Sequence, residues 1–150
     1  MDLHQDYRDI LNLLDENKVD YLVVGAFALA FLGVPRNTGD IDIWIRPDIE
    51  NAKKMVNTLN AFGLGSLGYE EKDFLDKNIV IQLGVPPVRI DILMSISGVD
   101  FDDAYSKKNI FVNENLKINF ISKEDFIKNK KSSGRLKDLA DIESISDTIE

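Results

Sequence analysis

The sequence predicts an α/β (α+β) fold in which a small, mixed and twisted sheet carries helices packed on one face. Near the N-terminus, apolar residues recur at helical spacing. Residues 40–45 then alternate strictly between isoleucine and other side chains, which is typical of a strand with one face in the core. Further short apolar runs are separated by glycine and proline, as expected for strands joined by turns. We expect one domain over residues 1–150, with a core that needs no disulfide or structural metal.

The first half of the chain is predicted to alternate helices and strands. The pattern predicts a helix ending near Asn17, a strand at 21–24, a helix at 26–32, a strand at 40–45 and a helix from Pro47 to about Gly63. Gly25 separates the first strand from a segment rich in helix-forming residues. Proline is favoured in the first turn of a helix, and glycine is favoured just after its end.

The second half is predicted to be richer in strands. The pattern predicts strands at 79–83 and 88–94, a hairpin of 110–112 with 116–121, a helix at 122–131 and a last helix from about Arg135. A Gly-Val-Pro-Pro turn joins the first two strands, and Asn113-Glu-Asn115 closes the hairpin. Ser122 is a good N-cap for the helix that follows it.

Composition limits the chemistry that the chain can perform. Lysine and arginine number 18 against 26 aspartates and glutamates, which gives a formal net charge of −8. The absence of cysteine excludes disulfide scaffolds, cysteine-ligated zinc and thiol catalysis. A single histidine, His4, disfavours multi-histidine metal sites and Ser-His-Asp triads. The acidic balance argues against broad non-specific nucleic-acid binding, so carboxylates are the chemistry that remains.

The sequence also gives an expectation about location. The longest apolar run, 21–34, has 14 residues and is interrupted by two glycines, whereas a membrane-spanning helix needs about 20 residues. The N-terminal residues are acidic and lack the pattern of a signal peptide. We therefore expect a cytoplasmic protein without membrane contact.

Three aspartates are the candidate catalytic and metal-binding residues. Asp40 and Asp42 share one face of their predicted strand, at a Cα separation of about 6.6–7 Å. Asp91 lies on another predicted strand and converges with them if the two strands are neighbours. Carboxylates so close repel one another unless a cation neutralises them, and oxygen ligands suit Mg²⁺ or Mn²⁺. Three acids on a rigid sheet can hold two divalent ions for in-line phosphoryl transfer.

Residues near the acids could bind an anion. Gly25 and Ala26, at a strand end that opens a helix, offer backbone N–H groups and the positive end of a helix dipole to a triphosphate. Arg36 and Thr38 add donors just before the acids. The segment 128–137 carries five basic residues and no acid, and it is either a solvated helix end or a phosphate contact.

These motifs resemble the nucleotidyltransferase superfamily that includes DNA polymerase beta and the antibiotic nucleotidyltransferases. The resemblance rests on Gly25-Ala26, thirteen intervening residues, Asp40-Ile-Asp42 and the later Ile90-Asp-Ile92. Among small bacterial members, it is strongest to the abortive-infection type, which often occurs in toxin–antitoxin systems. The residues that carry this closer resemblance are 24–30, Gly33, Arg36, Thr38, 40–42, 135–138 and Asp141.

The resemblance implies transfer of a nucleotidyl group from an NTP to an acceptor hydroxyl, with Mg²⁺ or Mn²⁺ as cofactor. It implies that Asp40 and Asp42 bind the metals that carry the nucleotide, and that Asp91 helps activate the acceptor oxygen. Gly25 would receive the triphosphate, and Lys137 would contact triphosphate or nucleic acid. The family usually has glycine or serine where Ala26 stands, so one phosphate contact is lost here.

Several points are left open by the sequence. The acceptor could be a tRNA end, a protein side chain or a small alcohol, and a homodimer partner or a second protein could complete the site. The alternative function is a non-catalytic nucleotide-binding or antitoxin module of the same fold. A glycosyltransferase is a more distant possibility, because the chain is short for such a fold with an acceptor lobe.

Overall fold

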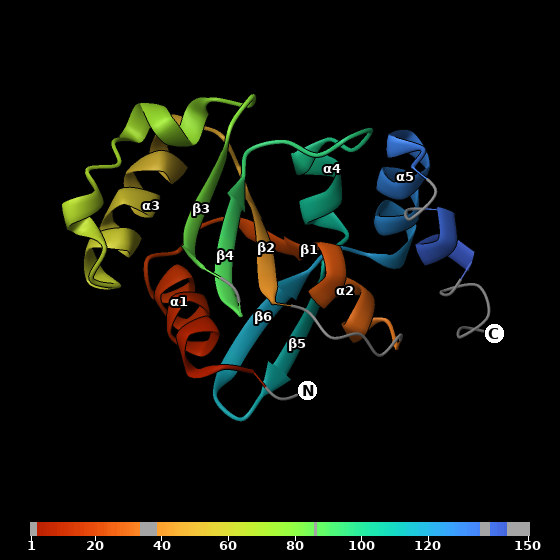
Figure 1. Cartoon of the computed structure of the whole chain (residues 1–150), viewed down its shortest axis with the longest axis horizontal. Coiled ribbons are helices and arrows are strands. Elements are labelled where there is room, and N and C mark those ends of the chain that lie inside the picture. The colour runs from red at the N-terminus through yellow and green to blue at the C-terminus, as the bar shows by residue number, and fades with distance from the viewer. Residues whose placement is uncertain (1–2, 34–38, 86, 136–138, 144–150) are drawn as a thin grey trace.

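The computed structural model describes residues 3–33, 39–85, 87–135 and 139–143, and its centre is a mixed six-stranded sheet in the order β3-β4-β2-β1-β6-β5 (Figure 1). The helices are α1 (Gln5–Glu16), α2 (Gly25–Phe31), α3 (Ile49–Ala61), η1 (Gly65–Leu67), η2 (Glu71–Leu75), α4 (Phe101–Ser106) and α5 (Lys123–Ser133). The strands are β1 (Tyr21–Val24), β2 (Asp40–Ile45), β3 (Val80–Val85), β4 (Val88–Leu93), β5 (Asn109–Asn113) and β6 (Leu116–Phe120).

Strand β2 lies in the middle of the sheet and joins its two halves. It pairs antiparallel with β1 and parallel with β4. Strand β1 in turn pairs parallel with β6, and the two outer strands β3 and β5 pair antiparallel with their neighbours. The mixed sheet predicted from the sequence is therefore confirmed.

The apolar core is continuous from the sheet to the helices. All four residues of β1 are buried, and this strand lies between β2 and β6. Ile41, Ile43 and Ile45 on one face of β2 are buried with the apolar stripes of α1 and α3, which pack against each other. The hydroxyl of Tyr7 in α1 donates to the carbonyl oxygens of Gly39 and Arg89, both at 3.3 Å. Helix α1 is thereby fixed to the beginnings of β2 and β4.

Helix α4 is present in the structure but was not predicted from the sequence. It packs on the other face of β2, where Phe101 meets the ring of Trp44 edge-on at a centroid distance of 5.0 Å. Helices therefore lie against both faces of the sheet, and not only against the face without the acids. The helix has six residues, too few for apolar periodicity to reveal it in the sequence. Among the described residues, no helix is long and apolar enough to cross a membrane.

Candidate functional site

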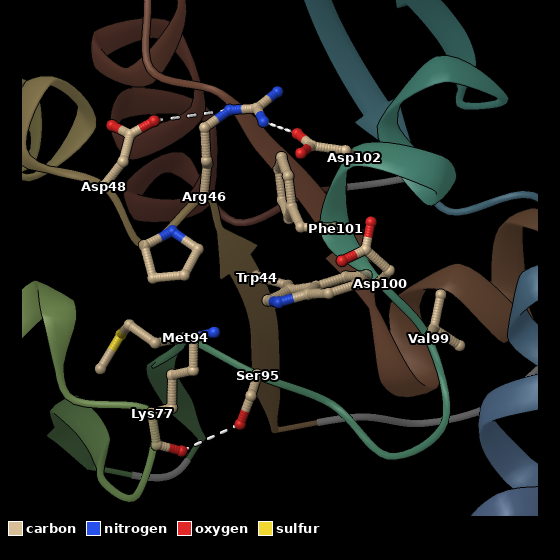
Figure 2. Close-up of a pocket in the computed structure, with 11 residues that line it drawn as sticks. Trp44, Arg46, Asp48, Lys77, Met94, Ser95, Val99, Asp100, Phe101 and Asp102 are labelled. Carbon is tan, nitrogen blue, oxygen red and sulfur yellow. Dashed lines mark hydrogen bonds and ion pairs between the residues drawn. The ribbon is translucent and has the colours of Figure 1, made fainter.

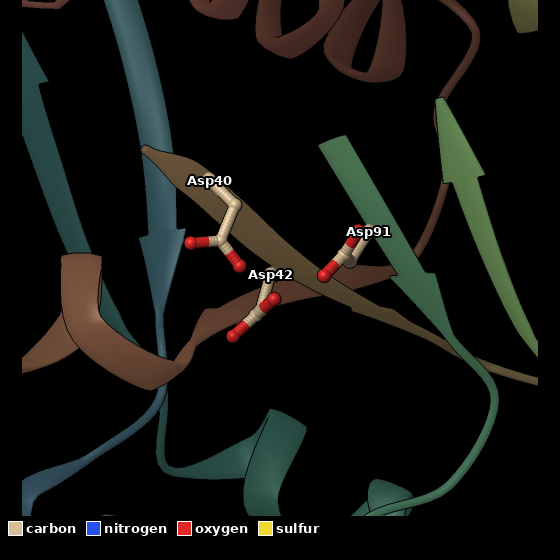
Figure 3. A group of neighbouring side chains, drawn as sticks. All are labelled: Asp40, Asp42 and Asp91. Atoms are coloured by element: carbon tan, nitrogen blue, oxygen red, sulfur yellow. The ribbon is translucent and has the colours of Figure 1, made fainter. Parts of the chain in front are cut away.

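The pairing of β2 with β4 brings the three aspartates together. Asp42 is the direct Cα partner of Asp91 across the parallel ladder, and Asp40 is the partner of Arg89. One carboxylate oxygen of each aspartate lies within 4.8 Å of an oxygen of the other two, and Figure 3 shows their side chains converging on one region. Asp91 is buried, while Asp40 and Asp42 are half-buried. The two strands are neighbours, which is the condition under which the sequence predicted the three acids to converge.

The environment of Asp42 disfavours its negative charge. Burial raises the pKa of Asp42 to about 7, and the charges of Asp40 and Asp91 and a hydrogen bond with Asp91 act in the same direction. Lys130 of α5 acts in the opposite direction and lowers this pKa. Near neutral pH the carboxyl group of Asp42 is therefore poised between its two protonation states. A divalent cation bound to oxygen ligands would offset the same charge, so these residues fit Mg²⁺ or Mn²⁺.

Sequence reasoning missed Arg89, whose guanidinium lies between two of the acids. Its Nε donates to Oδ1 of Asp91 at 3.0 Å, and its Nη2 donates to Oδ2 of Asp91 at 3.0 Å. The same Nη2 also donates to Oδ2 of Asp40 at 3.1 Å. Arg89 stands two residues before Asp91 on one strand, and this spacing places both side chains on the same face. That spacing is the signal that could have revealed it.

The junction of β1 and α2 approaches the acids closely at Gly25. This residue has a φ of +69°, in the left-handed region that favours glycine. A Cβ atom placed on Gly25 would come closer than 3.0 Å to Oδ2 of Asp42. Helix α2 begins here with Val24 as its N-cap, and no side chain caps its first N–H groups. Gly25 is thus adjacent to the carboxylates, and Ala26 follows it in the first turn of α2.

The other predicted contacts are only partly within the described residues. Arg36, Thr38 and Lys137 lie outside them. Of the basic segment 128–137, Lys130 belongs to α5 and acts on the pKa of Asp42, so this part of the segment is near the acids.

A separate cavity of about 290 Å³ lies around Trp44 (Figure 2). Several of its charged lining residues stabilise the fold. Asp48 caps α3 by accepting from the N–H of Asn51, and Arg46 forms an ion pair with Asp102. The guanidinium of Arg46 also lies over the ring of Phe101, 4.9 Å from its centroid. In this cavity Arg46, Asp48 and Asp102 are therefore engaged in contacts that hold the fold together.

Comparisons with solved structures identify proteins that share this fold. No curated protein matches the chain in sequence. Among solved structures, a presumed nucleotidyltransferase (TM1012) from Thermotoga maritima is 20% identical with a TM-score of 0.60, over 95% of this chain and 91% of that one. The lincosamide antibiotic adenylyltransferase LnuA, solved with lincomycin bound, is 19% identical with a TM-score of 0.56, over 96% of both chains.

A third solved structure extends the likeness to a fungal protein. An antigenic nucleotidyltransferase-like protein from Paracoccidioides brasiliensis is 17% identical with a TM-score of 0.56, over 93% of this chain and 73% of that one. At such identities these structures establish a shared fold. The family model described as nucleotidyltransferase of unknown function (DUF6036) matches residues 1–148. The chain therefore belongs to the DUF6036 family of nucleotidyltransferases.

Proposed function

We propose that this protein is a metal-dependent enzyme that transfers a nucleotidyl group from an NTP to an acceptor hydroxyl. The observation that supports the proposal best is the register of β2 and β4, which gathers three carboxylates from distant parts of the chain on one face of the sheet. A solvated strand face has no need of a third acid that is itself buried. Membership of a nucleotidyltransferase family gives the class of reaction.

In this proposal Asp40, Asp42 and Asp91 hold Mg²⁺ or Mn²⁺. When bound, such an ion supplies charge neutralisation and Lewis-acid stabilisation to the triphosphate. Asp91 is assigned to activation of the acceptor hydroxyl, whose oxygen forms a bond to the α-phosphorus as the bond to pyrophosphate breaks. This division of roles follows the resemblance of the motifs, and the convergence of the three side chains is compatible with it.

The triphosphate is proposed to lie at the start of α2. The first N–H groups of α2 carry no side-chain cap, and the helix dipole favours an anion there. Gly25 brings this backbone against Asp42, so one ligand could contact both. Ala26 contributes only its backbone N–H, because its side chain has no hydroxyl. From the resemblance we also propose phosphate contacts for Arg36, Thr38 and Lys137.

The acceptor is proposed to be a small hydroxylated molecule. LnuA is an antibiotic adenylyltransferase, and this chain and LnuA each cover 96% of the other, so the two are of similar extent. A tRNA end or a protein side chain are the competing acceptors, and a homodimer partner could complete the acceptor side. A toxin–antitoxin or phage-defence role rests on the resemblance alone.

Labelled NTPs test the proposed reaction directly. The protein is incubated with each NTP, Mg²⁺ and pools of small alcohols, RNA or protein, and transferred label is measured. Asp40→Asn should abolish transfer, whereas the control Asp9→Asn should leave it unchanged. Asp9 carries the same charge on the exposed side of α1, where it accepts from Gln5. Failure of every NTP and acceptor to give label would contradict the enzymatic function.

The second candidate function is nucleotide binding without turnover. It is favoured by Ala26 and by the ion pairs of Arg89, which partly neutralise Asp40 and Asp91 without any metal. NTP binding with no transferred label in the same experiment would support this function over catalysis.

A further inference from the structure

We propose that Arg89 is a built-in counter-ion that competes with a second divalent ion for Asp40 and Asp91. The inference rests on the proposed metal centre and adds the order in which two divalent ions bind there. The nucleotide-free protein takes one divalent ion, and a second ion is retained only when Arg89 gives up its contacts. Arg89 is thus a positioning residue that acts through the carboxylates.

The contacts of Arg89 are those of a cation that shares its charge between two acids. Its three hydrogen bonds engage both oxygens of Asp91 and one oxygen of Asp40, at 3.0 to 3.1 Å. Such a forked contact fixes the guanidinium in the plane of the Asp91 carboxylate. Because Arg89 is the cross-strand partner of Asp40, the ladder itself holds the three residues together.

Asp42 completes the argument because the hydrogen bonds of Arg89 to the acids go to Asp40 and Asp91 and not to Asp42. With Asp40, Asp42 and Asp91 ionised, the cluster carries a charge of −3, and Arg89 reduces it to −2. One divalent ion is then sufficient for neutrality, and the three hydrogen bonds of Arg89 to the acids reach neither oxygen of Asp42. A second ion at Asp91 would meet the guanidinium at close range. The Asp91 side chain is only 9% exposed, so water screens that repulsion poorly.

The proposal requires Arg89 to leave Asp91 when a second cation binds there. Its side chain is 29% exposed and so borders the solvent toward which it would turn. The triphosphate of a bound nucleotide would add the negative charge that a second ion needs. Arg89 would therefore oppose a second ion in the nucleotide-free protein, and two ions would be held together only in the substrate complex.

If the role of Arg89 were purely structural, its substitution would have the opposite effect on metal affinity. If the guanidinium only orients the two acids, its loss disorganises the ligands and weakens metal binding. If it competes with an ion, its loss strengthens metal binding. The sign of the change separates the two roles without any measurement of activity.

The experiment counts Mn²⁺ ions bound to the nucleotide-free full chain by electron paramagnetic resonance and calorimetry at pH 8. We expect one ion in the wild type and two in Arg89→Gln. Any second ion in the wild type should bind at least tenfold more weakly than the second ion of Arg89→Gln. Arg89→Lys, which keeps the charge, should bind one. The control Arg8→Gln changes the net charge equally at an exposed ion pair with Glu114 and should also bind one.

The outcomes distinguish the role of Arg89 from the existence of the metal centre. Two ions in the wild type, or one ion or weaker binding in a folded Arg89→Gln, would overturn the role of Arg89 and leave the metal centre intact. No bound Mn²⁺ in any variant would overturn the metal centre and this inference with it. If Arg89→Gln does not fold, the wild-type count decides alone, because the inference requires it to be one.

Discussion

Replacing Gly25 by alanine tests the close approach of the β1–α2 junction to the acids. An L-residue at a φ of +69° costs about 1–2 kcal/mol of left-handed strain. The added Cβ would also come closer than 3.0 Å to Oδ2 of Asp42, and relieving that overlap costs about 1–3 kcal/mol more. We expect Gly25→Ala to lower the free energy of unfolding by about 2–5 kcal/mol in total. The carboxylate of Asp42 should move away from its neighbours, so Mn²⁺ affinity should fall as well.

Gly68→Ala is the matched control for this substitution. Gly68 has a φ of +76°, and a Cβ atom there would meet no other atom within 4 Å. It therefore carries the backbone strain alone, about 1–2 kcal/mol, and should leave Mn²⁺ binding unchanged. Urea denaturation gives both losses, and calorimetry gives both affinities. Equal losses of stability, or unaltered Mn²⁺ affinity in Gly25→Ala, would refute the proposed proximity of Gly25 to a metal ligand.

Three further outcomes are expected. The pKa of Asp42 is raised to about 7 from an ordinary 3.8, so the metal-free protein should lose stability as the pH rises between these two values. The loss from this group should be at most about 4 kcal/mol. Added Mg²⁺ should restore stability at pH 8. Denaturation of Asp42→Asn should lack this component; a pH dependence equal to that of the wild type would contradict it. Asp91→Asn should lower turnover at least about a hundredfold and keep most NTP binding, whereas Asp40→Asn should damage both, as kinetics and calorimetry would reveal. NTP binding should weaken strongly in EDTA, and equal affinities with and without the chelator would argue against a metal-bridged nucleotide.

The sequence predicted that two of the acids share one face of β2, because alternation determines the face of a strand. Asp40 and Asp42 could be placed on one side of β2 from their spacing alone. Alternation says nothing about which strands are neighbours, and Asp91 lies 49 residues beyond Asp42. Their direct pairing therefore needed the three-dimensional register. The sequence predicted convergence only if the two strands are neighbours, and the β2–β4 ladder meets that condition.

Other parts of the site could not be read from the sequence. The α4 segment is too short to show a helical period, and the edge-on contact of Phe101 with Trp44 becomes visible only in the folded structure. Arg89 carried a spacing signal, but a basic residue beside Asp91 is ambiguous until the position of Asp40 across the ladder is known. The closeness of Gly25 to Asp42 likewise depends on a backbone conformation that sequence patterns do not specify.

The central position of β2 has a consequence for folding kinetics. Its pairing with β1 joins segments close in sequence, whereas its pairing with β4 closes a much longer loop. Long-range pairing of this kind is entropically costly and tends to form late. A cation that needs Asp91 together with Asp42 can therefore bind only after this late step. We expect Mg²⁺ to slow unfolding and to leave the refolding rate nearly unchanged, which stopped-flow chevrons would measure.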